Sequence, residues 1–231
     1  MLNGKTVYDM SDKEYGDFRK YATNLEQGTD EWSQARLGLV TASMVAGIMP
    51  GDKGKYKASR RNYMIELITE ILTGEQGESF FSKDMQRGIE KEPIARGMYE
   101  GKKGLLVDTV GLIPHPTIRG LAASPDGLVG KDTGLEIKCP KSATHVSTMI
   151  YGKINDEYIP QMITGMLCTE RPYWDFVSFD DRLPEDQQMV IIRNSLADFQ
   201  QYAEAILFEV SKFLTEMKIM LESVREYGKG E

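Results

Sequence analysis

Two acidic residues and a lysine lie close together near the middle of the chain, in a pattern that suits phosphate chemistry. Asp126 precedes a turn-rich segment, and Glu136 and Lys138 follow it. Residues two apart in a β-strand project from the same face, so Glu136 and Lys138 should lie side by side while Ile137 points into the core. Gly, Asp and Thr within residues 129–134 predict a hairpin turn, which brings Asp126 close to Glu136.

These residue types are those of a site for a hard divalent cation. Carboxylates held close together raise each other's pKa unless a cation lies between them. Mg²⁺ takes such oxygen ligands, and the backbone carbonyl of Ile137 would add another. Lys138 would orient a metal-bound water or stabilise developing negative charge. On these residues alone, the alternative is a solvated hairpin edge. The pattern Asp126…Glu136-x-Lys138 resembles that of the PD-(D/E)xK nuclease superfamily.

A second candidate site lies closer to the N-terminus. Residues 29–38 predict a helix that ends at a glycine, and Thr41-Ala42-Ser43 begins another, over residues 44–49. Hydroxyl groups at a helix N-terminus are suited to bind an anion. Arg36 and Ser43 therefore predict a phosphate clamp. The alternative is an N-cap serine beside a surface arginine.

The densest run of positive charge follows, in the glycine-rich loop 50–61. Lysines and arginines contact nucleic-acid backbones, and an aromatic ring offers a surface on which a base stacks. The predicted DNA contacts are Lys53, Lys55, Lys57 and Arg60, with Tyr56 as the stacking surface. A solvated, mobile loop is the competing interpretation.

Composition sets the wider limits. At 231 residues the chain is expected to form a single domain, and its formal net charge of −7 argues against non-specific coating of nucleic acid. A nuclease with its basic residues gathered in one channel is compatible with that charge. Cys139 and Cys168 are too few for a disulfide framework, and no apolar run suits a signal peptide or a membrane span. We expect a cytoplasmic protein without a membrane partner.

Apolar periodicity predicts the elements that must position these residues. Helices are expected over residues 12–21, 59–73, 142–151 and 157–169, and a long amphipathic helix over 196–227. Strands are expected at 105–107, 110–114, 121–123, 173–179 and 188–192.

A further helix is expected within residues 80–103, where Pro93 should break, kink or begin the helix. Glu90 and Glu92 are two apart and cannot share a helical face, so at most one of them is a ligand.

Several stretches occur together in an order that resembles one family. They are Gln27-Gly28, Trp32, Arg36-Leu37-Gly38, Thr41-Ala42-Ser43, Gly88-x-x-x-Glu92, Ser124-Pro125-Asp126-Gly127, Gly134-Leu135-Glu136-Ile137-Lys138-Cys139-Pro140 and Tyr158-x-x-Gln161. This string is similar to the phage lambda exonuclease, or YqaJ-type viral recombinase, family of the PD-(D/E)xK superfamily. The resemblance spans Glu26 to Gln161, and residues 1–25 form an N-terminal arm without a clear counterpart or assigned role.

The resemblance implies an α/β fold with a restriction-endonuclease-like core, in which helices flank a central mixed sheet, and a long C-terminal helix. It implies two Mg²⁺ ions, with Mn²⁺ as a substitute. One ion would be held by Asp126, Glu136 and the Ile137 carbonyl, and Glu92 would help at the second. Lys138 would activate water with Gln161 nearby, and the residues expected to bind a 5′-terminal phosphate are Arg36, Ser43 and Ser124.

The same resemblance implies an exodeoxyribonuclease that degrades linear double-stranded DNA from the 5′ end. It would release mononucleotides and leave a 3′ overhang for recombination by strand annealing. A ring-shaped homotrimer enclosing DNA, a single-strand annealing protein as partner and a phage or prophage origin in a bacterial cell are also implied. The rival hypotheses are a restriction-type endonuclease on the same fold and a non-catalytic module that binds DNA ends.

Overall fold

The strands of the protein form two sheets, and the chain passes directly from the smaller sheet to the larger one between β4 and β5. The computed structural model describes residues 5–51, 54–77 and 82–227. Within these residues, a five-stranded sheet has the order β2-β5-β6-β7-β8 and a three-stranded sheet the order β1-β4-β3. The strands are β1 (Val40–Thr41), β2 (Val107–Asp108), β3 (Ile113–Pro114), β4 (Leu121–Ala123), β5 (Gly127–Val129), β6 (Thr133–Lys138), β7 (Tyr173–Phe179) and β8 (Met189–Ser195).

The larger sheet is mixed, as expected from the sequence. β6 and β7 are parallel, with Glu136 opposite Phe176, whereas β5 pairs antiparallel with β6 and β8 antiparallel with β7. The predicted strand at 105–107 is displaced to β2, because Leu105 and Leu106 are exposed rather than paired. The strand expected at 110–114 shortens to β3.

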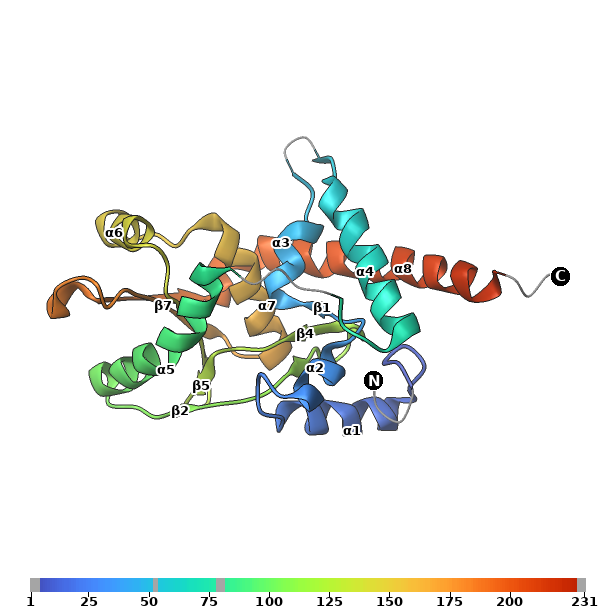
Figure 1. Ribbon diagram of the computed structural model, residues 1–231, viewed down its shortest axis with the longest axis horizontal. Coiled ribbons are helices and arrows are strands. Elements are labelled where there is room, and N and C mark those ends of the chain that lie inside the picture. Colours follow the sequence, from blue (N-terminus) through green and yellow to red (C-terminus); the bar gives the residue numbers. More distant parts are fainter. Residues whose placement is uncertain (1–4, 52–53, 78–81, 228–231) are drawn as a thin grey trace.

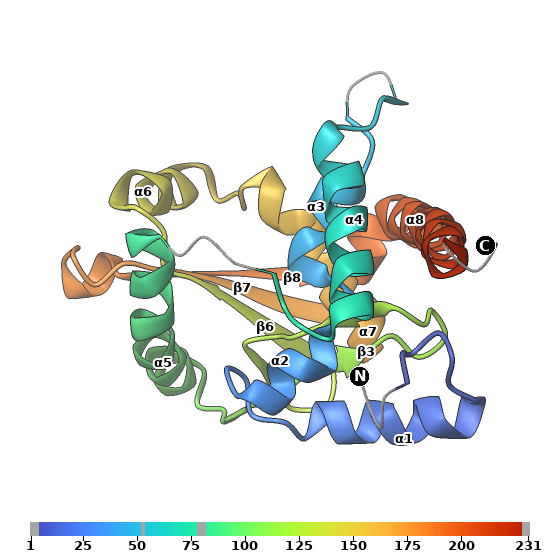
Figure 2. The ribbon, with the colours of Figure 1, turned by 45° about the vertical axis from the view of Figure 1, so that its right-hand side comes forward.

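Helices cover both faces of the larger sheet (Figures 1 and 2). They are α1 (Asp12–Thr23), α2 (Asp30–Arg36), α3 (Val45–Ile48), α4 (Ala58–Thr73), α5 (Lys83–Lys103), α6 (Ser142–Tyr151), α7 (Ile159–Thr169) and α8 (Gln200–Glu226). Short 3₁₀ turns are η1 (Ala42–Met44), η3 (Asp156–Tyr158), η4 (Glu185–Gln187) and η5 (Leu196–Phe199). The long C-terminal helix is thus confirmed, but it begins after η5 and crosses α4 (Figure 1).

The two faces of β6 and β7 have different partners because side chains alternate along a strand. Leu135, Ile137 and Val177 pack on the α5 face with Tyr99, so Ile137 points into the core as predicted. Trp174 and Phe176 pack on the opposite face with α7 and α8.

Glycine is required beside Trp174. A Cβ added at Gly134 in β6 or at Gly165 in α7 would lie 2.1 or 2.5 Å from the Trp174 ring. Those two glycines allow α7 to approach the strand that carries the candidate catalytic residues.

The N-terminal arm contributes to the core. Phe18 of α1 is buried in a cluster with Leu112 and Ala122, and the Tyr15 hydroxyl donates to the His115 carbonyl at 2.8 Å. In the described residues, no helix has the length and apolar character that crossing a membrane requires.

Candidate active site

The candidate catalytic residues lie where the chain passes from one sheet to the other. β4 of the smaller sheet ends at Ala123 and β5 of the larger sheet begins at Gly127, so Ser124, Pro125 and Asp126 form the junction. The Asp126 N–H donates to the Leu135 carbonyl at 3.1 Å. Asp126 Oδ2 accepts from the Ile137 N–H at 2.6 Å. Both bonds hold the Asp126 carboxylate beside β6.

Glu136, Lys138 and Gln161 form one hydrogen-bonded group. Lys138 Nζ lies 2.7 Å from Glu136 Oε1. Gln161 reaches this pair from α7: its Nε2 donates to Glu136 Oε1 at 2.6 Å and its Oε1 accepts from Lys138 Nζ at 3.2 Å. The structure therefore brings together the four residues that the sequence predicts as catalytic. Tyr158 adds its ring, with Lys138 Nζ 5.3 Å from the ring centroid.

Negative charge is in excess at this junction. Burial raises the pKa of Asp126 well above its ordinary value, and the carboxylates of Glu136 and Glu92 raise it further. Burial also raises the pKa of Glu92, against the effect of Arg96. Burial alone would lower the pKa of Lys138, but Glu136 and Asp126 outweigh it and the net pKa is raised. Lys138 is therefore protonated at neutral pH.

The donor set suits a hard divalent cation, because the buried carboxylates repel one another and a cation between them would reverse the raised pKa of Asp126. Among the described residues, no three acidic, histidine or cysteine side chains already converge as a metal cage. Glu92 is instead ion-paired with Arg96, one turn along α5. Glu90 hydrogen-bonds Gln86 on the exposed side of that helix, so at most Glu92 of the two reaches the site.

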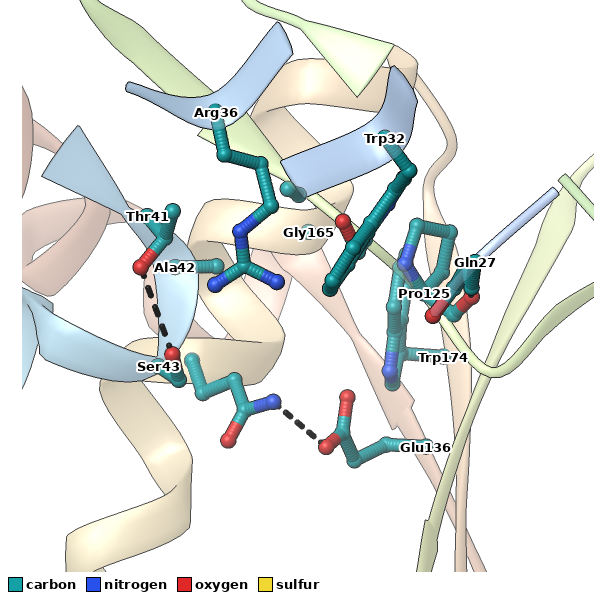
Figure 3. Close-up of a pocket in the computed structure, with 13 residues that line it drawn as sticks. Gln27, Trp32, Arg36, Thr41, Ala42, Ser43, Pro125, Glu136, Gly165 and Trp174 are labelled. Atoms are coloured by element: carbon teal, nitrogen blue, oxygen red, sulfur yellow. Dashed lines mark hydrogen bonds between the residues drawn. The ribbon is translucent and has the colours of Figure 1, made fainter. Parts of the chain in front are cut away.

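A small pocket adjoins the carboxylates and contains the predicted phosphate clamp. It has a volume of about 160 Å³, and Arg36, Ser43, Ser124, Glu136 and Gln161 all line it (Figure 3). The Arg36 guanidinium points into this space from α2. One cavity thus joins Arg36 and Ser43 to Ser124, as the predicted phosphate clamp requires.

Arg36 carries a positive charge without an acidic hydrogen-bond partner in the described part of the chain. Its guanidinium stacks 4.1 Å from the Trp32 ring centroid, and burial lowers its pKa. The Ser124 hydroxyl is buried and has no hydrogen-bond partner among the described residues. A half-buried cation and an unsatisfied hydroxyl on one cavity favour an anionic ligand.

Comparison with known proteins decides the family. Residues 31–172 match the model of the YqaJ-like viral recombinase domain. The chain belongs to this family. An alkaline exonuclease, LHK-Exo from Laribacter hongkongensis, is 49% identical over 87% of this chain and 98% of its own, with a TM-score of 0.80. Its complex with dAMP is 50% identical over the same shares, with a TM-score of 0.79.

A more distant structure shows the fold alone. The phage-related exonuclease from Haemophilus somnus 129PT is 17% identical over 78% of this chain and 96% of its own, with a TM-score of 0.51. A comparison with curated proteins finds no match. The family, the fold class and the assignment as a nuclease-type enzyme, all predicted from the sequence, are confirmed.

Family membership also draws attention to side chains that sequence reasoning left without a role. The amide of Gln27 donates to the carbonyls of Val110 and Pro125 at 2.8 and 2.9 Å, so it supports the junction next to Asp126. Thr41 lies 3.4 Å from Ser43, Oγ1 to Oγ, on the pocket wall. Gln27 stands in the family-like string, but only the fold shows which backbone it holds.

The basic loop needs a correction. Arg60, predicted as a DNA contact, is 7% exposed, and its Nη1 lies 2.6 Å from Glu216 Oε2 of α8. Its guanidinium also stacks over Tyr56, 4.3 Å from the ring centroid, so Arg60 joins α4 to α8 rather than facing solvent. Lys55 and Lys57 are exposed, as a DNA contact requires. Lys53 lies outside the described residues.

Proposed function

We propose that this chain is a Mg²⁺-dependent exodeoxyribonuclease that degrades the 5′-ended strand of linear duplex DNA. It would release mononucleotides and leave a 3′ single-stranded overhang. Its family and the exonucleases that it resembles support this assignment. The supporting feature within the chain is the pocket that joins the half-buried Arg36 guanidinium, which has no acidic hydrogen-bond partner among the described residues, to the carboxylate group.

That pocket would account for attack at an end rather than within a duplex. Glu136 and Gln161 line it together with Arg36, so a terminal phosphate bound at Arg36 lies directly beside the catalytic group. The next phosphodiester along the strand then reaches Asp126 and Lys138. One nucleotide would leave in each cycle. A 5′ phosphate would be preferred to a 5′ hydroxyl because it would accept from Arg36 and from the Ser124 hydroxyl, which has no hydrogen-bond partner among the described residues.

Asp126, Glu136 and the Ile137 carbonyl are the proposed ligands of one Mg²⁺, and Glu92 is the proposed ligand of a second, with Mn²⁺ as a substitute. When bound, such ions lower the pKa of water and stabilise charge on the attacked phosphate. Lys138 contributes a fixed positive charge and a hydrogen-bond donor beside the attacking water. Gln161 fixes the side chains of Glu136 and Lys138 relative to each other, because it forms a hydrogen bond with both.

The 3′ overhang is the chemical form that a single-strand annealing protein takes up, so we propose such a protein as the functional partner in recombination. A homotrimeric ring would retain the duplex between cycles. The formal net charge of −7 fits basic groups confined to a DNA channel. We place the activity in the cytoplasm of a bacterial cell, with a phage or prophage origin, and in one domain spanning residues 1–231.

The direct test uses linear duplex labelled at either the 5′ or the 3′ end, with Mg²⁺. We expect early release of a 5′-labelled mononucleotide while the 3′ label stays on long products. Closed circular DNA should stay intact. Cutting of the circle would indicate an endonuclease instead, and loss of the 3′ label first would reverse the proposed polarity.

A further inference from the structure

We propose that α5 is held on either side of Glu92 by two polar clamps, and that Arg87 is a positioning residue for metal binding. Through α5, Arg87 would fix Glu92 relative to Asp126 and Glu136. This inference rests on the proposed function, because it takes Glu92 as a metal ligand.

Helix α5 has few stabilising contacts of its own near Glu92. Pro93 follows Glu92 directly and lies inside the helix, which continues through it although a break, kink or start was expected. A proline has no N–H, so the helical hydrogen bond to the Ile89 carbonyl is missing. The buried residues of α5 are Ala95 and Tyr99, both beyond Pro93. The half that ends at Glu92 therefore has no buried apolar anchor.

A first clamp, formed by Arg87 and Lys91, replaces that anchor. Arg87 Nη1 donates to the Cys139 carbonyl at 3.0 Å, and Nη2 donates to Asp180 Oδ1 at 3.0 Å and to Asp181 Oδ1 at 2.6 Å. Lys91 Nζ lies 2.7 Å from Asp181 Oδ2. Cys139 directly follows Lys138, so Arg87 ties α5 to the end of the catalytic strand.

A second clamp holds the other half of α5. The Tyr99 hydroxyl donates to Asp175 Oδ2 at 2.7 Å, and Lys103 Nζ lies 3.7 Å from the same oxygen. Asp175 also accepts from Arg193 of β8. Both clamps therefore use β7 and the residues that follow it as their base, with α5 lying against the sheet in Figure 2.

The spacing of the clamps fits an antiparallel helix and strand. The 12 residues from Arg87 to Tyr99 rise roughly 18 Å in a helix. The five residues from Asp175 to Asp180 rise roughly 17 Å in a strand. Because the two lengths match, the clamps fix the position of α5 along β7, and Glu92 lies between them.

The structure also supplies a matched control. Arg182 bonds the same buried Asp180: its Nε donates to Oδ1 at 2.6 Å and its Nη2 donates to Oδ2 at 3.0 Å. It also reaches the Pro140 carbonyl. Arg182 belongs to the loop itself and makes none of these bonds with α5. Removing Arg182 disturbs Asp180, whereas removing Arg87 disturbs Asp180 and releases α5.

The test measures Mn²⁺ binding to the full chain by titration calorimetry, with Tm recorded for every variant. We expect Arg87→Ala to weaken Mn²⁺ binding by about 10-fold, as is usual when a group that supports a metal ligand is lost. Arg182→Ala should lower the Tm and leave the Mn²⁺ affinity unchanged. Asp181 is half-exposed, and among the described residues its carboxylate pairs only with Arg87 and Lys91 of α5. Asp181→Asn should therefore weaken binding in the same direction even if Arg87→Ala does not fold.

A double-mutant comparison shows whether Arg87 acts through Glu92. Glu92→Gln should weaken Mn²⁺ binding, and the double variant Arg87→Ala/Glu92→Gln should bind no more weakly than Glu92→Gln alone. If the double variant lost Mn²⁺ affinity by the product of the two single losses, Arg87 and Glu92 would act independently and the inference would be wrong. Unchanged binding in both Arg87→Ala and Asp181→Asn, or an equal loss in Arg182→Ala, would also overturn it. If the wild type neither binds Mn²⁺ nor cleaves DNA, the proposed function fails as well.

Discussion

Two groups of acidic residues lie on or next to strands β6 and β7, and the pKa values of their carboxylates are shifted in opposite directions. At the catalytic junction, Asp126 has its pKa raised well above the ordinary value by burial and by Glu136 and Glu92. Beside β7, burial works in the same direction on Asp180, but hydrogen bonds from Arg182 outweigh it and hold the pKa at about 2. Asp175 likewise has a lowered pKa, because Arg193 and Tyr99 donate to it.

The comparison separates a structural acid from a functional one. Burial disfavours the ionised carboxylate at both places, so the neighbouring groups decide the direction of the pKa shift. Around β7, every carboxylate oxygen of Asp175 and Asp180 has a donor, and the folded chain gains from the charge. At the junction, carboxylates exceed the cations that face them, which weakens the fold but suits a site that takes up cations.

The largest effect should follow from removing the one lysine of the catalytic group. Lys138→Ala is expected to lower the rate of DNA hydrolysis by about 10²–10⁴-fold, the range for a lost group that handles charge or protons in the transition state. Binding of a DNA end should survive. The readouts are release of end label and a gel-shift titration. Lys141→Ala is the control, since Lys141 is exposed and its side chain pairs only with Asp84 among the described residues. Full activity of Lys138→Ala would refute the assignment.

The second effect tests the structural group. Asp175→Ala leaves Arg193 and the Tyr99 hydroxyl without their acceptor and should lower the free energy of unfolding by about 3 kcal/mol. Chemical denaturation of the variant and the wild type measures this difference. A change near zero would mean that the second clamp contributes no net stability.

The contribution of Asp180 to stability should depend on pH, which tests the same comparison at low pH. Its folded-state pKa, about 2, lies below the unfolded value, so its contribution to stability is full above the unfolded pKa and is lost as pH falls toward 2. Asp180→Asn should therefore destabilise the chain at neutral pH, with the difference from wild type shrinking below roughly pH 4. If the difference in stability between wild type and Asp180→Asn stayed constant down to pH 2, the charge of Asp180 would not be what stabilises the fold.

A smaller effect is expected at the pocket that contains Arg36. Arg36→Ala should lower the rate on 5′-phosphorylated duplex roughly 10–100-fold, the loss expected for charged hydrogen bonds of about 1.5–3 kcal/mol. The rate on 5′-hydroxyl duplex should change little, so the variant loses its preference. Parallel assays on the two substrates provide the control. Equal wild-type rates on both would remove the support for terminal phosphate binding.

Local patterns predicted the catalytic hairpin well, because strand alternation and turn residues act over short distances. Glu136 and Lys138 share a face as expected, and Asp126 lies beside Glu136. Arg60 was misplaced because its burial depends on Glu216, far along the chain. The clamps of α5 were also invisible, since residues from separate elements form them. Pro93 misled for the same reason: tertiary contacts hold the helix across it.

The smallest effect is the most diagnostic, because it predicts that a damaging substitution stabilises the fold. The folded-state pKa of Asp126 lies above the unfolded value, so the folded chain binds the extra proton and stability falls as pH rises through that window. Asp126→Asn cannot ionise, and its amide oxygen can still accept from the Ile137 N–H. At pH 8 in EDTA, the variant should have a higher Tm than wild type, by roughly 2–4 °C for each kcal/mol of relieved repulsion.

Adding Mg²⁺ should reverse that order, because a cation that binds only the folded wild type raises its Tm, and the variant has lost a ligand. Thermal melts at pH 4 and pH 8, with EDTA or Mg²⁺, give the four values needed. At pH 4 the two proteins should differ less, since Asp126 is then protonated in the folded state. If Asp126→Asn were less stable than wild type at pH 8 in EDTA, the junction would be as well neutralised as the acids beside β7, and the contrast between the two groups would not hold.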